Sequence, residues 1–382
     1  MPNPPRGGDG KPRVSSRRPG CRDALRSDSD LFISGTGPSG ALQGTAMSGS
    51  RDTSIQDGRP SFPNGKGLVP ISAHVLSPST VGAFSVYLVQ DDKPVLYATK
   101  GESFTPRHRQ RLAELDVNQL YIVPSERKAY VNFVRDNLTT LLDDESIPCS
   151  ERARFFCEAT TALARDAFDR SLPNPGGVVR FRRIQTLIRD GSNFFTGPEG
   201  VREIFRLVSE NEDLYAHGVG CMVLSASLLS RFAPDDRELL TACSMGALMH
   251  DVGKLELPEH ILNAAPDALE HHDMEQLHSH PALGVSVCSI LPLPQESLHC
   301  ILFHHELEDG SGYPTRASGD MIPFYARIVS LCNFYEGLIR ERPWRRALSP
   351  REALCRIRDH GGKFDRTMVE LLEGVVTRSG MV

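Results

Sequence analysis

The stretch 301–314, ILFHHELEDGSGYP, places two histidines side by side, follows them with three acidic residues and then breaks into a Gly-Ser-Gly turn. Neighbouring residues of a helix point about 100° apart, so His304 and His305 cannot both face one apolar core. Burying an unpaired imidazole costs several kcal/mol, whereas a bound metal ion would satisfy both rings. The pair therefore predicts further metal ligands elsewhere in the chain.

Histidines concentrate in the same part of the chain, because ten of the thirteen lie between residues 217 and 305. His250 and Asp251 are adjacent at the end of the apolar segment LLTACSMGALMH, and Lys254 follows one helical turn later. His280 stands immediately before a proline, at the start of another expected helix. Each group falls on its own helical pattern, which is how bundles assemble internal metal sites.

Neutral imidazoles combined with one or two carboxylates suit a hard or borderline divalent cation. Taken singly, each residue has a simpler explanation: a lone histidine is usually a satisfied core or surface residue, and Lys254 alone would be a surface lysine. Their occurrence together favours a metal site. The predicted ligands are His217, His250, Asp251, His280, His304 and His305. Asp213 lies four residues before His217 and is expected on the same helical face.

The chain divides by composition into four parts. Residues 1–66 are rich in Gly, Pro, Ser and Arg and are expected to form a disordered tail. Residues 67–127 combine short strand patterns with one helix and predict a small α+β accessory module. Residues 128–194 predict a helical connector, and residues 195–378 predict an all-α helical bundle. The fold class is therefore mainly α.

Composition excludes several classes of protein. The net charge of −5 gives no overall attraction to nucleic acid, so no DNA partner is expected. No apolar run reaches the roughly 18–20 residues of a membrane span, and the N-terminus lacks a secretory signal. Nine cysteines without a CxxC pair predict reduced thiols. The expected location is cytoplasmic.

The histidine motifs resemble the HD-GYP domain, a subgroup of the HD phosphohydrolase superfamily, over about residues 195–376. The shared motifs are HDVGK at 250–254, HP at 280–281 and the long signature HHELEDGSGYP at 304–314. Residues 68–140 are also similar to a short module that often precedes such domains. The length of the third motif makes this resemblance specific.

The resemblance implies hydrolysis of cyclic di-GMP, a bacterial second messenger, to pGpG or GMP with two or three divalent ions, iron or manganese. It implies that Lys254 and Asp251 take part in catalysis. The implied metal ligands are Asp213, His217, His250, Asp251, His280, His304, His305 and Asn333. The implied contacts with the dinucleotide are Gly312, Tyr313, Pro314, Arg342 and Arg345.

General chemistry agrees with these roles. Two cations about 4 Å apart lower the pKa of a shared water and clamp the attacked phosphate. The glycines of the turn at 309–314 would let backbone approach a ligand, and Tyr313 would present a ring for stacking on guanine. The resemblance also implies that this loop contacts diguanylate cyclase domain proteins. The connector is expected to pair with a second copy of itself.

One ligand position departs from the family pattern. Where members usually carry an aspartate, the segment LCNFYEG at 331–337 has Asn333, which offers a carbonyl oxygen but no charge. Glu336, one turn later, is expected to compensate. Three functions remain open: a phosphodiesterase with reduced activity, a receptor or protein-interaction module that binds cyclic di-GMP without turnover, and a phosphohydrolase of another nucleotide. The retained histidines and Lys254 favour the first.

Overall fold

The computed structural model describes the chain from residue 67 to residue 382, apart from four short segments: 77–81, 92, 169–174 and 210–213. The predicted tail 1–66 and the candidate ligand Asp213 therefore lie outside the described residues. Among the described residues, no helix combines the length and apolar character that crossing a bilayer requires. The eight described cysteines are all free thiols.

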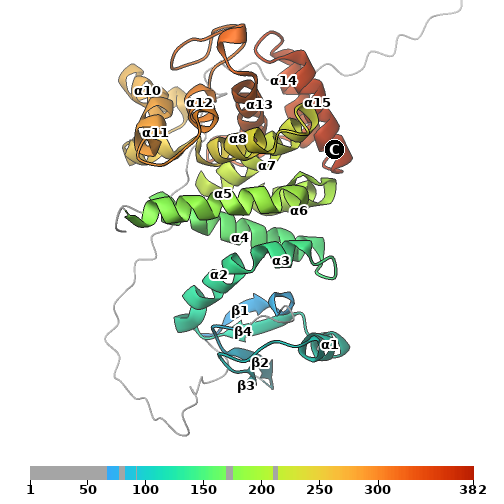
Figure 1. The fold of residues 1–382 in the computed structure, drawn as a ribbon. Helices are drawn as coiled ribbons and strands as arrows, with labels where there is room; N and C mark the ends of the chain where they lie inside the picture. The colour runs from blue at the N-terminus through green and yellow to red at the C-terminus, as the bar shows by residue number, and fades with distance from the viewer. Residues whose placement is uncertain (1–66, 77–81, 92, 169–174, 210–213) are drawn as a thin grey trace, which may run out of the picture.

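The N-terminal module is a four-stranded antiparallel sheet with one helix beside it (Figure 1). The sheet has the order β1-β4-β2-β3, and its strands are β1 (Val69–Ser72), β2 (Val86–Gln90), β3 (Lys93–Ala98) and β4 (Gln119–Ile122). Helix α1 (Pro106–Glu114) begins after Thr105, as its Thr-Pro sequence predicts. The sequence did not indicate β1, whose four residues include a proline and are too few for a clear alternation.

The connector stacks helices above the sheet (Figure 1). These helices are α2 (Arg127–Asp136), α3 (Leu138–Asp143), α4 (Cys149–Phe168) and α5 (Pro175–Thr196). The rings of Phe156 and Phe195 lie with centroids 5.2 Å apart where α4 meets α5. Buried side chains of the module, the connector and the bundle join in one continuous hydrophobic core.

The remaining helices form the bundle. They are α6 (Pro198–Ser209), α7 (Leu214–Phe232), α8 (Arg237–Met249), α9 (Glu259–Leu262), α10 (His271–His278), α11 (His280–Cys288), α12 (Gln295–Phe303), α13 (Phe324–Ile339), α14 (Pro350–Asp359) and α15 (Arg366–Arg378). Strand patterns end at β4, as predicted. The short helices α9 and α10 were not predicted, because their polar stretch lacks apolar periodicity.

Glycines allow the central helices to approach closely. Every residue of α7 from 216 to 229 is buried, which is typical of a helix enclosed on all sides. A Cβ atom at Gly218 would lie 2.3 Å from the carbonyl oxygen of Leu248 on α8. A Cβ atom at Gly253 would lie 2.0 Å from the carbonyl oxygen of His280. These contacts require glycine, and they bring the histidine-bearing helix ends together.

Candidate metal centre

Six of the predicted ligands come from the ends of four helices, and Asn333 lies within a fifth, α13. His217 lies in the first turn of α7, His250 ends α8, and Asp251 follows it directly. His280 is the first residue of α11, and His304 ends α12. All of these side chains are buried, as are those of Lys254, His305 and Asn333. The structure thus brings together every predicted metal ligand that lies within its described residues.

Asp251 lies at the middle of the cluster. Its Oδ1 is 3.2 Å from His280 Nε2 and 3.5 Å from His304 Nε2. Its Oδ2 is 3.6 Å from His217 Nε2 and 3.5 Å from His250 Nε2. One carboxylate therefore faces two pairs of imidazoles with its two oxygens. We call the Oδ2 side half-site A and the Oδ1 side half-site B.

Backbone carbonyls set the tautomer of three histidines, that is, which ring nitrogen carries the proton. The Nδ1 atoms of His250, His280 and His304 each lie 2.7 Å from the carbonyl oxygen three residues earlier in the chain. A carbonyl oxygen only accepts, so Nδ1 must carry the proton and the neutral ring leaves Nε2 as a bare lone pair. Metal-binding histidines are commonly oriented in this way.

The lone pairs face one another at distances that suit shared ions. His280 Nε2 and His304 Nε2 are 3.0 Å apart, and His217 Nε2 and His250 Nε2 are 3.2 Å apart. Burial lowers the pKa of His217 to about 4 and that of His304 to about 3, so both are neutral near pH 7. Two ligands placed about 2.1 Å from one ion are separated by roughly 3.0–3.4 Å. Each half-site therefore fits a divalent cation.

Asn333 and His305 complete the two half-sites. Asn333 Oδ1 lies 3.0 Å from His217 Nε2, within half-site A. His305 offers a nitrogen within 4.8 Å of the ligand atoms of Asp251, His280 and His304, in half-site B. Half-site B therefore combines three imidazoles with a carboxylate oxygen. Half-site A has two imidazoles, a carboxylate oxygen and a neutral amide.

Glu336 does not occupy the ligand position expected for it. His217 Nδ1 donates to the carboxylate of Glu336, which is buried and also accepts from Arg340 Nε at 3.0 Å. The carboxylate therefore lies on the side of the His217 ring that faces away from Asp251. Although burial alone would raise it, the Arg340 guanidinium and His217 hold the pKa of Glu336 well below its usual range. Glu336 orients a ligand and is not itself a replacement ligand.

Lys254 is bound directly to the central carboxylate. Its Nζ donates to Asp251 Oδ2 at 2.7 Å, and both side chains are buried. Burial opposes ionisation of Asp251, but the adjacent Lys254 ammonium outweighs it and keeps the pKa of Asp251 well below its usual value. The two groups form an ion pair at the edge of half-site A. The ammonium is thus held beside the position where an ion would sit.

Tyr313 is placed differently from the expectation. Its ring stacks on His278 with centroids 3.9 Å apart and on His305 with centroids 4.6 Å apart, and both pairs are nearly parallel. Two rings can stack on a third in this way only from opposite faces. Histidines therefore cover both faces of the Tyr313 ring, and its stacking on a guanine base stays a prediction. His278, two residues before His280, was not singled out from the sequence, and it covers the outer face.

Gly312 is required for a different contact from the one expected. A Cβ atom at this position would lie 2.5 Å from the carbonyl oxygen of His305 and 2.6 Å from Glu306 Cα. The loop therefore needs glycine to pack against its own chain, next to the double histidine. Close approach to a ligand does not explain this residue. The following Pro314 is joined to Tyr313 by a cis peptide bond.

The two predicted arginines have different surroundings. Arg342 is buried, and it lies close enough to Lys254 for its positive charge to lower the pKa of Lys254. Burial lowers the pKa of Arg342 itself to about 10. Arg345 donates to the carbonyl oxygens of Gly337 at 2.6 Å and Leu338 at 2.9 Å, near the end of α13. Arg342 therefore lies beside the cluster, whereas Arg345 holds the backbone of a helix end.

Cys221 is a further residue at the cluster that the sequence did not single out. Its sulfur lies 3.8 Å from both ring nitrogens of His217. Its sulfur and ring nitrogens of His217 and His250 all lie within 4.8 Å of one another, and all three side chains are buried. The thiol is therefore a further candidate donor beside half-site A. The sequence could have indicated Cys221 through its position one helical turn after His217.

The low pKa values predict acid sensitivity of the metal-free protein. Between pH 6.5 and about 4, the unfolded chain binds protons at His217 and His304 that the folded chain does not. Stability therefore falls as pH falls, and we expect a loss of about 2–3 kcal/mol between pH 7 and 5.5. Urea unfolding of metal-free protein at the two pH values measures this loss. The change His271→Gln, at a side chain that is 90% exposed, should leave it unaltered; an unfolding free energy independent of pH would contradict the prediction.

Comparison with known proteins agrees with the cluster. Residues 206–368 match the family model described as HD domain. A cyclic di-GMP phosphodiesterase of Pseudomonas aeruginosa, PA4108, is 29% identical over 171 residues, which cover 44% of this chain and 40% of that protein. The cyclic di-GMP phosphodiesterase response regulator RpfG of Xanthomonas campestris is 34% identical over 131 residues, 34% of either chain. These comparisons support the resemblance of the helical bundle to the HD-GYP family.

The fold of a solved HD-GYP structure is also similar. Bd1817, described as an HDG"Y"P protein from Bdellovibrio bacteriovorus, superimposes with a TM-score of 0.58 at 22% sequence identity. The match covers 81% of this chain and 99% of that one, so it extends beyond the HD-GYP domain into the preceding residues. The chain spans less than half the length of the two curated relatives named above.

Proposed function

We propose that this chain is a metal-dependent phosphodiesterase that hydrolyses cyclic di-GMP. The observation that carries the proposal is the Asp251 carboxylate, which faces two pairs of imidazole Nε2 atoms and accepts from Lys254. The names of the two relatives indicate the substrate. The alternatives of a receptor without turnover and of another nucleotide substrate become outcomes of the test below.

The proposed ligands follow the two half-sites. Half-site A would use His217, His250, Asn333 and Asp251 Oδ2; half-site B would use His280, His304, His305 and Asp251 Oδ1. When bound, two divalent ions supply a water of near-neutral pKa and positive charge for the phosphate. Iron or manganese is the proposed metal, and a third ion would depend on Asp213.

The protein's own groups would bind and orient the phosphodiester. The Lys254 ammonium lies at the edge of half-site A, where it can stabilise negative charge on a phosphate oxygen. Arg342 lies close by and suits a second phosphate contact. Tyr313 covers His305, so a base could reach this side only if the loop 309–314 moved. The products pGpG or GMP, loop contacts with diguanylate cyclase domain proteins and a dimer through the connector remain proposals.

Hydrolysis by the purified protein tests the function. With added manganese, the full chain should convert cyclic di-GMP to linear products that chromatography separates. Lys254→Met should lower kcat by about 10²–10³ because charge stabilisation at the phosphate is lost. Lys128→Met, on the exposed surface of the connector, should leave kcat unchanged. Binding without turnover in the wild type would select the receptor instead, and turnover of only a different cyclic dinucleotide would reassign the substrate.

The amide in half-site A leads to a prediction about metal content. Asn333→Asp adds one negative charge 3.0 Å from His217 Nε2, where a hard cation would gain an anionic ligand. We expect manganese affinity at the weaker site to rise by at least about tenfold, which corresponds to about 1.4 kcal/mol. Isothermal titration of metal-free protein measures this change. Unchanged affinity and stoichiometry would show that position 333 does not ligate.

A further inference from the structure

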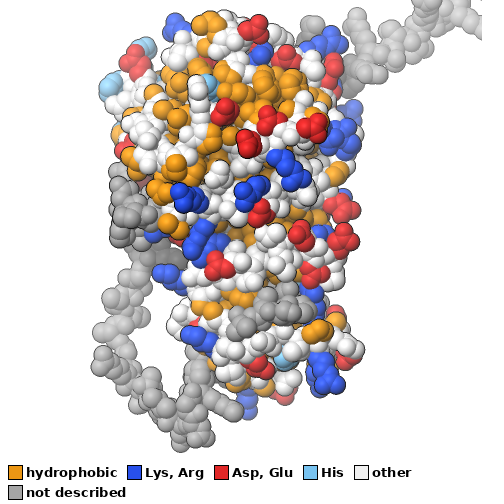
Figure 2. All heavy atoms as spheres, viewed as in Figure 1, with side chains coloured by type: hydrophobic (Ala, Val, Ile, Leu, Met, Phe, Trp, Pro, Cys, Tyr) orange, Lys and Arg blue, Asp and Glu red, His pale blue; other side chains and the backbone are white. Residues whose placement is uncertain are grey.

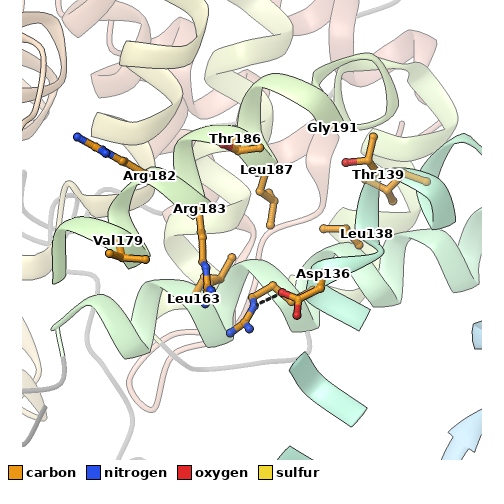
Figure 3. A pocket seen from close by; sticks show the side chains of 12 residues that line it. Asp136, Leu138, Thr139, Leu163, Val179, Arg182, Arg183, Thr186, Leu187 and Gly191 are labelled. Atoms are coloured by element: carbon orange, nitrogen blue, oxygen red, sulfur yellow. Dashed lines mark hydrogen bonds and ion pairs between the residues drawn. The ribbon is translucent and has the colours of Figure 1, made fainter. Parts of the chain in front are cut away.

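A cavity of about 410 Å³ lies in the connector, apart from the metal centre (Figure 3). It opens between the α2–α3 corner, α4 and α5. Its volume falls within the range of small-molecule pockets, which is about 300–1,000 Å³. The same α5 packs against α7 and α8, so the cavity lies one helix away from the elements that carry His217 and His250.

The inner part of the cavity is apolar. Leu138, Leu142, Leu163 and Leu187 line it, and all four side chains are buried. They come from three different helices, α3, α4 and α5. This lining suits a hydrocarbon chain or ring, because such a group gains free energy when it leaves water.

The rim of the cavity carries arginines. The Arg135 side chain is only 14% exposed, and its Nε lies 3.1 Å from Oδ1 of Asp136, whose side chain is 60% exposed. Within the described part of the chain, Asp136 is the one hydrogen-bonding partner of Arg135. That hydrogen bond uses Nε, so the two terminal NH₂ groups of the Arg135 side chain keep donors for a ligand. A largely buried guanidinium with one exposed partner favours an added anion.

Arg183 adds a second positive charge. In Figure 3 its side chain points into the cavity toward Asp136, whereas the Arg182 side chain points away. Neither residue has a hydrogen-bond or ion-pair partner among the residues that the structure describes. Figure 2 shows basic side chains, with acidic ones among them, across the middle of the molecule. Helix α5 itself contains four arginines and a single aspartate, so its own charge favours an anion.

We propose that this cavity binds a small amphipathic anion, a carboxylate attached to an apolar chain. The carboxylate would accept from the NH₂ groups of Arg135 and Arg183, since the planar guanidinium matches its two oxygens. The apolar chain would lie against the four leucines. This site is separate from the phosphodiesterase centre and does not depend on bound metal.

Calorimetric titration of the full-length, metal-free protein with decanoate, below its micelle concentration, tests the proposal. We expect saturable binding of one decanoate per chain. Arg183→Gln should weaken it by at least about tenfold, as the loss of a charge-assisted hydrogen bond implies. Arg182→Gln is the matched control, adjacent on the same helix and pointing away, and it should change the affinity by less than about twofold.

Three results would overturn the proposal. The first is a titration in which decanoate gives no saturable heat. The second is equal binding of decanol, which has the same chain without the charge. The third is a loss of binding in Arg182→Gln as large as that in Arg183→Gln. Circular dichroism of each variant shows that it is folded. Because Arg183 is exposed, its replacement should leave the fold intact. A failure here leaves the hydrolysis of cyclic di-GMP untouched, since the cavity shares no residue with the metal centre.

Discussion

Replacing Asp251 with asparagine is expected to remove both half-sites and to destabilise the protein at the same time. Both carboxylate oxygens face imidazole Nε2 atoms, so the loss of one negative charge weakens each ion. The change also leaves the Lys254 ammonium buried without its carboxylate. Removing one partner of a buried ion pair costs about 3–5 kcal/mol. We therefore expect manganese content to fall below about a tenth of the wild-type value.

A second variant separates the two effects. Adding Lys254→Met to Asp251→Asn removes the ammonium group that had paired with Asp251. The unfolding free energy should therefore largely recover, while metal binding stays lost. Urea unfolding of metal-free protein and mass spectrometry of bound metal measure the two quantities. Asp320→Asn, at a fully exposed carboxylate, should alter neither. If Asp251→Asn retained full metal content, the central role of this carboxylate would be refuted.

Glu336→Gln is expected to have the second large effect. The Glu336 carboxylate accepts from both His217 and Arg340, and all three side chains are buried. A neutral amide would remove the negative charge that the buried Arg340 guanidinium pairs with at this position, and breaking a buried ion pair costs about 3–5 kcal/mol. It would also loosen the orientation of the His217 ring, and the loss of such a supporting carboxylate lowers metal affinity by about 10–100-fold.

The chain contains a matched control for this prediction. Glu370 and Arg366 form an ion pair of the same composition on α15, with the same four-residue spacing, but their side chains are 62% and 93% exposed. Glu370→Gln should therefore change the unfolding free energy by less than about 0.5 kcal/mol. Chemical denaturation compares the two variants directly. Equal effects would mean that burial of the Glu336–Arg340 pair is not what makes it important.

The sequence indicated the candidate metal ligands because their spacing is a local property. His250–Asp251 and His304–His305 each occur at the end of an apolar helix, and such adjacent polar residues need a partner that a core does not offer. The same reasoning found the module and the bundle, because strand and helix periods differ. It missed α10 and β1, where the pattern is too short or too polar to show a period.

Contacts between distant segments could not be predicted from the sequence. Glu336 and Asn333 are one turn apart on α13, yet Asn333 faces His217 Nε2 while Glu336 accepts from the opposite nitrogen. That assignment depends on how α13 is rotated against α7. Tyr313 shows the same limit: its motif suggested an open ring, but packing placed it between His278 and His305.

By itself, the sequence determined which residues are candidates for metal binding and which helices carry them, because residue type and helical period can be read along the chain. Only the tertiary structure decided that one carboxylate serves two half-sites, that Glu336 supports a ligand, and that the connector encloses a cavity lined with leucine and arginine. Those features arise where separate helices meet. Their distances depend on close packing at positions such as Gly218 and Gly253, which no local pattern reveals.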